Sequence, residues 1–227
     1  MTSKNKLEVC CCDIESVIAA KEGGADRIEL CSALEVGGLT PSLGLIKETV
    51  KHFGDGVFVL VRERPGDFVY SPLEINVMAE DIKLAVKEGV SGIVIGALTE
   101  DGNIDTAATR VLIQAAGDLP ITFHRAFDLV KDPINSLEKI IELGCHRILT
   151  SGQKESAETG IPLLKQLNDK AGNRIVILAG AGVTSDNAAK ILKETGGKEI
   201  HASAKIMIGD HMRSSSEKVK EIKKEIS

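Results

Sequence analysis

Residues 22–31 of the chain read EGGADRIELC, the end of a helix followed at once by a short strand. A glycine in the left-handed conformation just after the last turn is a common helix ending. The same pattern recurs at 87–90, 142–145 and 194–197. In each case a charged residue is followed by glycine, by a small or apolar residue and then by a strand. These four connections share one pattern, so we expect one repeated βα architecture.

Apolar runs alternate with amphipathic stretches along the rest of the chain. Eight short apolar runs predict strands, and eight stretches with apolar residues at helical spacing predict helices. Eight units in 227 residues are about 28 residues each, close to the length of a βα unit. The predicted strands are Leu7–Cys12, Arg27–Cys31, Val57–Arg62, Gly92–Ala97, Ile121–Arg125, Arg147–Thr150, Ile175–Ala179 and Glu199–Ser203. The predicted helices are Ile14–Glu22, Leu43–Phe53, Leu73–Glu88, Asp105–Ala116, Ile134–Leu143, Pro162–Lys170, Ser185–Thr195 and Ser214–Ile226.

A chain that alternates strands and helices folds either as a closed barrel or as a doubly wound open sheet. The open sheet often carries Gly-x-Gly-x-x-Gly after its first strand, whereas Cys12-Asp13-Ile14-Glu15 stands there in this chain. Eight units also match the closure of a barrel. No linker or change of composition divides the chain. We therefore predict an α/β fold, a TIM (β/α)8 barrel, as a single domain over residues 1–227.

Composition excludes several classes of partner. Hydrophobic residues make up 43% of the chain and aromatic residues only 3%, so the core is aliphatic, as suits buried parallel strands. So few aromatic side chains argue against a stacking platform for single-stranded nucleic acid. A net charge of −5, with both signs interspersed, argues against attraction to nucleic acid or to an anionic membrane. We expect no nucleic-acid partner and no membrane partner.

The N-terminus and the cysteines predict a cytoplasmic location. Met1–Lys6 is polar and does not resemble a signal peptide, and no apolar run approaches the roughly 20 residues that span a membrane. Five cysteines, an odd number, do not make a disulfide framework in a chain of this length. Reduced thiols are typical of the cytosol.

Strand alternation places ionisable side chains on the interior face of the predicted barrel. Every second residue of a strand shares a face, so Glu8 lies with Cys10 and Glu29 lies with Cys31. Barrel interiors usually hold Val, Ile and Leu, and ionisable groups there are costly unless paired. We predict an active site at the C-terminal ends of the strands, or alternatively a buried ion network that sets register, with Glu29 and Arg62 as one pair. The candidate catalytic residues are Glu8, Glu29, Arg62, His124, Arg125, Asp128 and His201.

Cys10 and Cys31 lie on neighbouring predicted strands with the same facing. Two thiolates so placed can approach closely enough to bind a soft ion such as Cu(I). The alternative is that both are small buried hydrophobic residues, as free cysteines commonly are. Both interpretations stay open at this point.

The glycine-rich turn LAGAGVTS, residues 178–185, runs from the seventh strand into a helix. Backbone N–H groups and the helix dipole favour an anion there, and the loops after strands seven and eight of barrels often hold phosphate. Tight packing is the alternative reason for such a turn. The candidate anion-binding residues are Gly180, Gly182, Val183, Thr184 and Ser203.

Taken in order, several segments resemble the CutC family, the copper-homeostasis proteins. The resemblance implies a cytosolic TIM barrel, often oligomeric, that is linked to copper tolerance or trafficking. It places Cys10 and Cys31 at positions proposed in the family for Cu(I). Two residues depart from the family pattern. Gln153 stands where the family has another Gly or a Cys, and Ala181 stands where the family often has Gly. The segments are Leu7–Cys10, Gly23–Ser32, Gly37–Ser42, Arg62–Ser71, Gly96–Gly102, Thr122–Asp128, Leu149–Gly152 and Glu199–Ala204.

Three functions remain open from the sequence. The first is copper homeostasis with Cu(I) bound by Cys10 and Cys31, and we expect no organic cofactor. The second is an enzyme that acts on a small anionic or phosphorylated molecule, with His124 or Glu29 as general acid or base. The third is a scaffold whose interior charges are structural. The partner is a copper ion or a small anionic molecule, and the assembly is a homodimer or a higher homo-oligomer.

Overall fold

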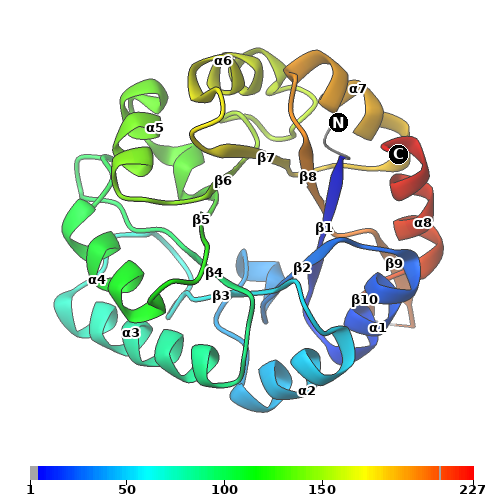
Figure 1. The fold of residues 1–227 in the computed structure, drawn as a ribbon, viewed down its shortest axis with the longest axis horizontal. Coiled ribbons are helices and arrows are strands. Elements are labelled where there is room, and N and C mark those ends of the chain that lie inside the picture. The colour runs from blue at the N-terminus through cyan, green and yellow to red at the C-terminus, as the bar shows by residue number, and fades with distance from the viewer. Residues whose placement is uncertain (1–4, 210) are drawn as a thin grey trace.

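In the computed structural model, which describes residues 5–209 and 211–227, eight strands close into one parallel barrel in chain order (Figure 1). Each strand pairs with the next, and the first pairs with the eighth. The TIM barrel predicted from the alternation of elements is therefore confirmed. The strands are β1 (Lys6–Cys11), β2 (Arg27–Leu30), β3 (Val57–Leu60), β4 (Gly92–Ile95), β5 (Ile121–Phe123), β6 (Arg147–Thr150), β7 (Val176–Gly180) and β8 (Glu199–Ala202).

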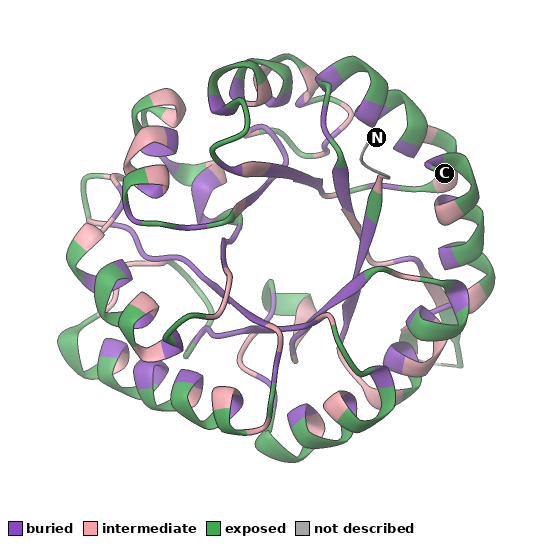
Figure 2. Ribbon diagram, in the orientation of Figure 1, coloured by how far each residue is buried: buried purple, intermediate pink, exposed green. Residues whose placement is uncertain are grey.

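Helices surround the barrel, with their buried faces turned toward the strands (Figure 2). Side-chain caps start most of them: Asp13, Ser42, Asp105 and Asp132 each accept a backbone N–H of the first turn. No helix in the described ranges is both long and apolar enough to cross a membrane. The helices are α1 (Ile14–Gly23), α2 (Leu43–Phe53), α3 (Pro72–Lys87), α4 (Thr106–Ala116), α5 (Pro133–Glu142), α6 (Ile161–Ala171), α7 (Ser185–Thr195) and α8 (Ser216–Glu225).

The last connection of the chain differs from the prediction. Residues that follow β8 form an antiparallel hairpin of β9 (Lys205–Ile208) and β10 (His211–Ser214). The final helix therefore begins at Ser216 rather than at Ser214, because Ser214 pairs with Lys205 and Ser215 caps the helix. Arg125 was also predicted in a strand, but β5 ends at Phe123 and a short 3₁₀ helix, Arg125–Leu129, follows.

An ion network fills part of the barrel interior, where aliphatic layers are usual. Arg27 binds the carboxylates of both Glu8 and Glu199, and Arg147 binds Glu199 as well, with 3.0 Å between Nε and Oε2. Both guanidinium groups also lie near the ring of Phe58, with its centroid 5.1 Å from Cζ of Arg27 and 5.3 Å from Cζ of Arg147. These side chains belong to the structural network that the sequence left open as an alternative.

Backbone strain gathers at the same end of the barrel as the C-termini of the strands. Among the residues that the structure describes, four non-glycine residues have a left-handed backbone, with φ between 47° and 84°. Ala33 follows β2, Gln153 follows β6, Ala181 follows β7 and Ala204 follows β8. Such conformations cost roughly 1–3 kcal/mol each and tend to occur at functional sites.

Candidate functional site at the barrel mouth

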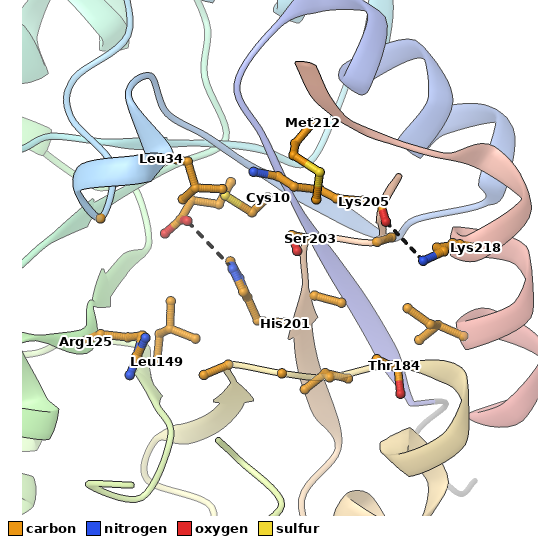
Figure 3. A pocket seen from close by; sticks show the side chains of 18 of the residues that line it. Cys10, Leu34, Arg125, Leu149, Thr184, His201, Ser203, Lys205, Met212 and Lys218 are labelled. Atoms are coloured by element: carbon orange, nitrogen blue, oxygen red, sulfur yellow. Dashed lines mark hydrogen bonds and ion pairs between the residues drawn. The ribbon is translucent and has the colours of Figure 1, made fainter. Parts of the chain in front are cut away.

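A cavity of about 730 Å³ opens at the C-terminal ends of the barrel strands. In Figure 3, Arg125 and Leu149 stand on one side of it, and Lys205 and Lys218 stand on the other, with His201 between them. The hairpin and α8 form the second side, so elements beyond the eighth strand complete the cavity.

Three cysteine thiols meet beside this cavity, of which Cys10 lines it and Cys12 lines a neighbouring cavity. Sγ of Cys31 lies 3.6 Å from Sγ of Cys10 and 3.6 Å from Sγ of Cys12. All three sulfurs lie within 4.8 Å of one another. Cys10 faces Glu29 across the β1–β2 register, and Cys12 and Cys31 stand just after the ends of these strands. Parallel strands of matched register thus bring all three thiols together.

The three thiols differ in their ease of ionisation. Hydrogen bonds from Cys10 and Cys31 hold the pKa of Cys12 well below its ordinary value, against the effect of burial, and the charge of Lys205 helps. The same interactions raise the pKa of Cys10. Cys12 is partly exposed, whereas Cys10 and Cys31 are buried. Cys12, on the more open side of the cluster, is therefore the thiol that ionises most readily.

Glu8 and Glu29 bracket the imidazole of His201. Nδ1 of His201 lies 2.7 Å from Oε1 of Glu8, and Nε2 lies 3.8 Å from Oε2 of Glu29. Burial alone would favour neutral His201, but the bond to Glu8 and the charge of Glu29 raise its pKa. Burial raises the pKa of Glu29 to about 7. With Cys10, Glu29 and His201 form a second group whose ligand atoms lie within 4.8 Å of one another.

His124 stands on Phe68 in the cavity wall, next to Arg62. The ring centroids of His124 and Phe68 are 4.9 Å apart, and Cζ of Arg62 lies 4.8 Å from the Phe68 ring. Nδ1 of His124 accepts the backbone N–H of Ala126 at 3.1 Å. Burial and the charge of Arg62 lower the pKa of His124 to about 3. The ring is thus neutral and carries its proton on Nε2.

We expect the imidazole of His124 to remain neutral across pH 5–8, as the Nε2–H tautomer. Because only the unfolded chain takes up a proton near pH 6.5, the folded protein loses stability as pH falls from 6.5 toward 3. Nitrogen chemical shifts of ¹⁵N-histidine-labelled protein over this range measure both tautomer and charge. Titration of this ring near pH 6.5 would contradict the assignment.

Asp128 anchors the loop after β6 and lies outside the residues that line the cavity. Its carboxylate accepts from Thr150 Oγ1, from the backbone N–H groups of Ser151 and Gln153, and from Nε of Arg125 at 2.8 Å. Its predicted catalytic role stays a prediction, and its contacts describe a residue that positions Arg125 and this loop.

Replacing Asp128 with asparagine is expected to destabilise the fold by about 1–3 kcal/mol, because the backbone N–H groups of Ser151 and Gln153 lose an acceptor and have no other partner among the described residues. Urea unfolding measures the change. Hydrogen exchange should accelerate most at Ser151 and Gln153. Unchanged exchange at these two amides would show that the carboxylate does not hold the loop.

The predicted anion-binding residues divide between the cavity and the barrel wall. Gly182, Val183, Thr184 and Ser203 line the cavity. Gly180 ends β7, where an added Cβ would lie 2.6 Å from Leu149 Cδ1, so tight packing accounts for this glycine. The N–H of Thr184 donates to Asn187 Oδ1 at 2.9 Å, which occupies one donor of the α7 N-terminus. An anion at this turn stays a prediction.

The structure brings most of the predicted catalytic residues to one cavity and adds others. Glu29, Arg62, His124, Arg125 and His201 line it, whereas Glu8 lies behind His201. The predicted pairing of Glu29 with Arg62 is not among the ion pairs of the described residues. Alternation along the first strand places Cys12 on the face of Cys10 and could have added it to the metal ligands. The remaining additions are Phe68, Lys205, Met212 and Lys218.

Known proteins match almost the whole chain. The model of the CutC family matches residues 5–206. A CutC family protein of Pasteurella multocida is 54% identical over 200 residues, which cover 88% of this chain and 82% of that protein. The human copper homeostasis protein cutC homolog is 49% identical over 199 residues, which cover 88% of this chain and 73% of that protein.

Solved structures agree with this relationship. A CutC structure from Streptococcus agalactiae matches with a TM-score of 0.84 at 38% identity, over 88% of this chain and 98% of that chain. A thiamine phosphate pyrophosphorylase from Pyrococcus furiosus, with a TM-score of 0.65 and 18% identity, covers 97% of this chain and 95% of its own and shares the fold alone. From its sequence and its structure alike, the chain belongs to the CutC family.

Proposed function

We propose that this protein serves copper homeostasis by binding Cu(I) through the thiolates of Cys10, Cys12 and Cys31. The observation that carries the proposal is the position of Cys31 Sγ, 3.6 Å from both of the other sulfurs. The name of the human relative, a copper homeostasis protein, supports it. Two of the three ligands are those predicted from the sequence, and Cys12 is added by the geometry.

The donor set fits a soft, low-coordinate ion. Thiolates select Cu(I) over harder metals. With a metal–sulfur bond of roughly 2.3 Å, as for thiolates on zinc, three sulfurs around one ion lie roughly 4 Å apart. The observed separations of 3.6 Å require shifts of only a few tenths of an ångström. Binding displaces the protons of the thiols that are still protonated and leaves three thiolates on the ion.

A Cu(I) titration against a strong competing chelator tests the proposal, on reduced protein under anaerobic conditions. We expect one tightly bound Cu(I) per chain, and loss of that binding when all three cysteines are replaced by serine. Zn(II) is the matched control, because it prefers four ligands. Cu(I) binding that persists in the triple variant would refute the thiol site.

A cytoplasmic location is part of this proposal. All five cysteines are free, although the sulfurs of Cys10 and Cys31 are close neighbours. An oxidising compartment would drive such thiols toward a disulfide and remove two copper ligands. Localisation of a tagged protein in cell fractions tests this part directly.

A second candidate function is catalysis on a small anionic or phosphorylated molecule. The line of Glu8, His201 and Glu29 favours it, because the carboxylate of Glu8 orients an imidazole whose Nε2 faces the cavity. A general acid or base needs this kind of fixed geometry. The test incubates metal-free protein with phosphorylated and carboxylated metabolites and follows them by NMR. Turnover lost in His201→Asn would support catalysis, and no turnover of any of them would count against it.

We also propose a homodimer formed through the outer face of α3. Leu73, Val77 and Leu84 lie on one stripe of this helix and are 76%, 49% and 41% exposed. Val111 of α4 is exposed to a similar extent. An apolar stripe of this kind favours association. Sedimentation equilibrium should show a dimer that Leu73→Lys with Val77→Lys converts to a monomer. A monomeric wild type would refute the assembly.

A further inference from the structure

Arg62 is a buried cation without a carboxylate partner among the described residues. It is 3% exposed, just beyond the end of β3. Nη1 donates to the carbonyl oxygens of Val36 and Gly38, and Nη2 donates to that of Gly66 at 2.8 Å. A guanidinium has five N–H donors, so two remain. Neutral carbonyls satisfy hydrogen bonds but leave the positive charge uncompensated, which is costly in a buried site.

The loop around Arg62 is built to hold the guanidinium. Gly37 and Gly38 have φ of 90° and 88°, a conformation that brings the carbonyls of residues 36 and 38 toward Nη1. A Cβ on Gly37 would lie 3.1 Å from Nη1, and a Cβ on Gly38 would lie 2.6 Å from Leu60 Cδ2. Side chains are thus excluded at both glycine positions, and the guanidinium of Arg62 is held in the cavity wall.

His124 supplies a second donor at the same wall. Nε2 has no hydrogen-bond partner among the described residues, although His124 is only 5% exposed. Since Nδ1 accepts from Ala126, Nε2 carries the proton and can only donate. Both Arg62 and His124 pack on Phe68, and all three line the cavity. A buried donor without an acceptor is energetically costly, so this wall is incomplete without an acceptor.

We propose that Arg62 and His124 form the binding subsite for an oxyanion, a carboxylate or phosphate group of a small organic molecule. The cation and three free N–H donors match oxygen atoms that carry negative charge. The cavity of about 730 Å³ exceeds a bare inorganic anion and leaves room for the rest of a metabolite. This site goes beyond copper binding, because none of the three thiols belongs to it.

Other charges at the cavity leave this subsite favourable to an anion. Glu29 faces His201, which offsets its charge, and Asp186 and Glu221 belong to α7 and α8 on the side of the hairpin. Lys205 and Lys218 line that same side and add positive charge. The acidic side chains therefore do not neutralise Arg62.

The test follows the His124 ring in reduced, copper-free, ¹⁵N-histidine-labelled protein. Inorganic phosphate and malonate are the two probes, and sodium chloride at matched ionic strength is the control. We expect at least one probe to shift the Nε2 resonance of His124 in a saturable way. A preference for phosphate identifies a phosphorylated ligand, and a preference for malonate identifies a carboxylic acid.

Two substitutions separate the subsite from a general charge effect. His124→Asn keeps an acceptor for the N–H of Ala126 but removes the Nε2 donor, whereas His124→Gln can place an N–H near that point. We expect His124→Asn and Arg62→Gln to weaken binding roughly tenfold to a hundredfold, and His124→Gln to recover part of it. Arg110→Gln, which removes an exposed charge from α4, should have no effect. Isothermal titration calorimetry measures the affinity of each variant, because the variants at position 124 lack the reporter ring, and circular dichroism shows whether each is folded.

Three outcomes would overturn the proposal. They are no saturable shift with either probe, an equal shift with chloride, or wild-type affinity in a folded His124→Asn variant. None of them bears on the Cu(I) titration, because the experiment contains no copper and Cys31→Ser should bind the anion like the wild type. Failure of the subsite and failure of the copper site are therefore distinguishable.

Discussion

Replacing Cys31 with serine is expected to remove tight Cu(I) binding while the barrel stays folded. Its sulfur is the one that lies 3.6 Å from both Cys10 and Cys12, so its loss leaves no thiol between them. A hydroxyl is a hard ligand and does not replace a thiolate on Cu(I). Loss of an outer-shell partner costs roughly tenfold to a hundredfold in metal affinity, and loss of a direct ligand should exceed that.

The companion variants decide how many thiols bind the ion. Cys12→Ser should weaken Cu(I) binding if the site has three ligands and leave it unchanged if only Cys10 and Cys31 bind. Cys145→Ser is the matched control, because Cys145 is also buried, at 5% exposure, and lies in the connection before β6. Competition with a chelator measures all of these affinities. Wild-type affinity in Cys31→Ser would exclude the cluster as the copper site.

Replacing Arg27 with methionine is expected to destabilise the barrel by about 3–5 kcal/mol, because two buried carboxylates lose their shared partner. Arg27 lies between Glu8 and Glu199, and the side chains of all three are at most 8% exposed. Methionine fills similar volume but cannot neutralise either acid. Urea unfolding at pH 7 measures the loss as a lower midpoint.

Arg174→Met is the matched control, since Arg174 pairs with Glu138 at the surface, where both side chains are over 40% exposed. Solvent screens such a surface pair, so it contributes little to stability. The pH dependence adds a second readout. Burial would raise the pKa of Glu8, but Arg27 and the bond from His201 lower it from 4.5 to about 2. Its contribution is present above pH 4.5 and is lost as pH falls from 4.5 toward 2, so in Arg27→Met, where the pKa of Glu8 is lowered less, the loss of stability over this range should be smaller.

An equal effect of Arg174→Met, or a variant of Arg27 as stable as the wild type, would show that the interior network does not stabilise the barrel. The ion network would then serve a purpose other than stability, because the presence of a buried salt bridge is by itself weak evidence that it stabilises a protein. The two measurements together therefore test the network rather than charge removal in general.

The barrel could be predicted from sequence because its signals are local. Gly24 takes the left-handed conformation expected at the end of α1, with φ of 82°, and β2 follows three residues later. The hairpin after β8 escaped prediction, although an apolar run at residues 206–208 is followed by Gly209, a common turn residue. The predicted eighth helix begins at Ser214, and the expected pattern of eight βα units has no place for two more strands.

The site was only partly accessible from sequence because it depends on contacts between distant segments. Alternation gives the facing of Cys10, Cys12 and Cys31, whereas the distances between their sulfurs depend on how the chain leaves β1 and β2. That Arg62 binds three carbonyl oxygens, rather than Glu29, follows from the path of the loop around Gly37. No periodic pattern encodes such a path.

The left-handed alanines at 33, 181 and 204 have a consequence for attempts to engineer the protein. Glycine at these positions would relieve strain in the native state but enlarge the freedom of the unfolded chain. A screen for heat resistance would readily find glycine substitutions at these positions. The selected variants would have more flexible loops around the ligand-binding cavity. Selection for stability and selection for ligand affinity should therefore favour different substitutions first at the mouth of the barrel. The outer helices should accept substitutions under either selection.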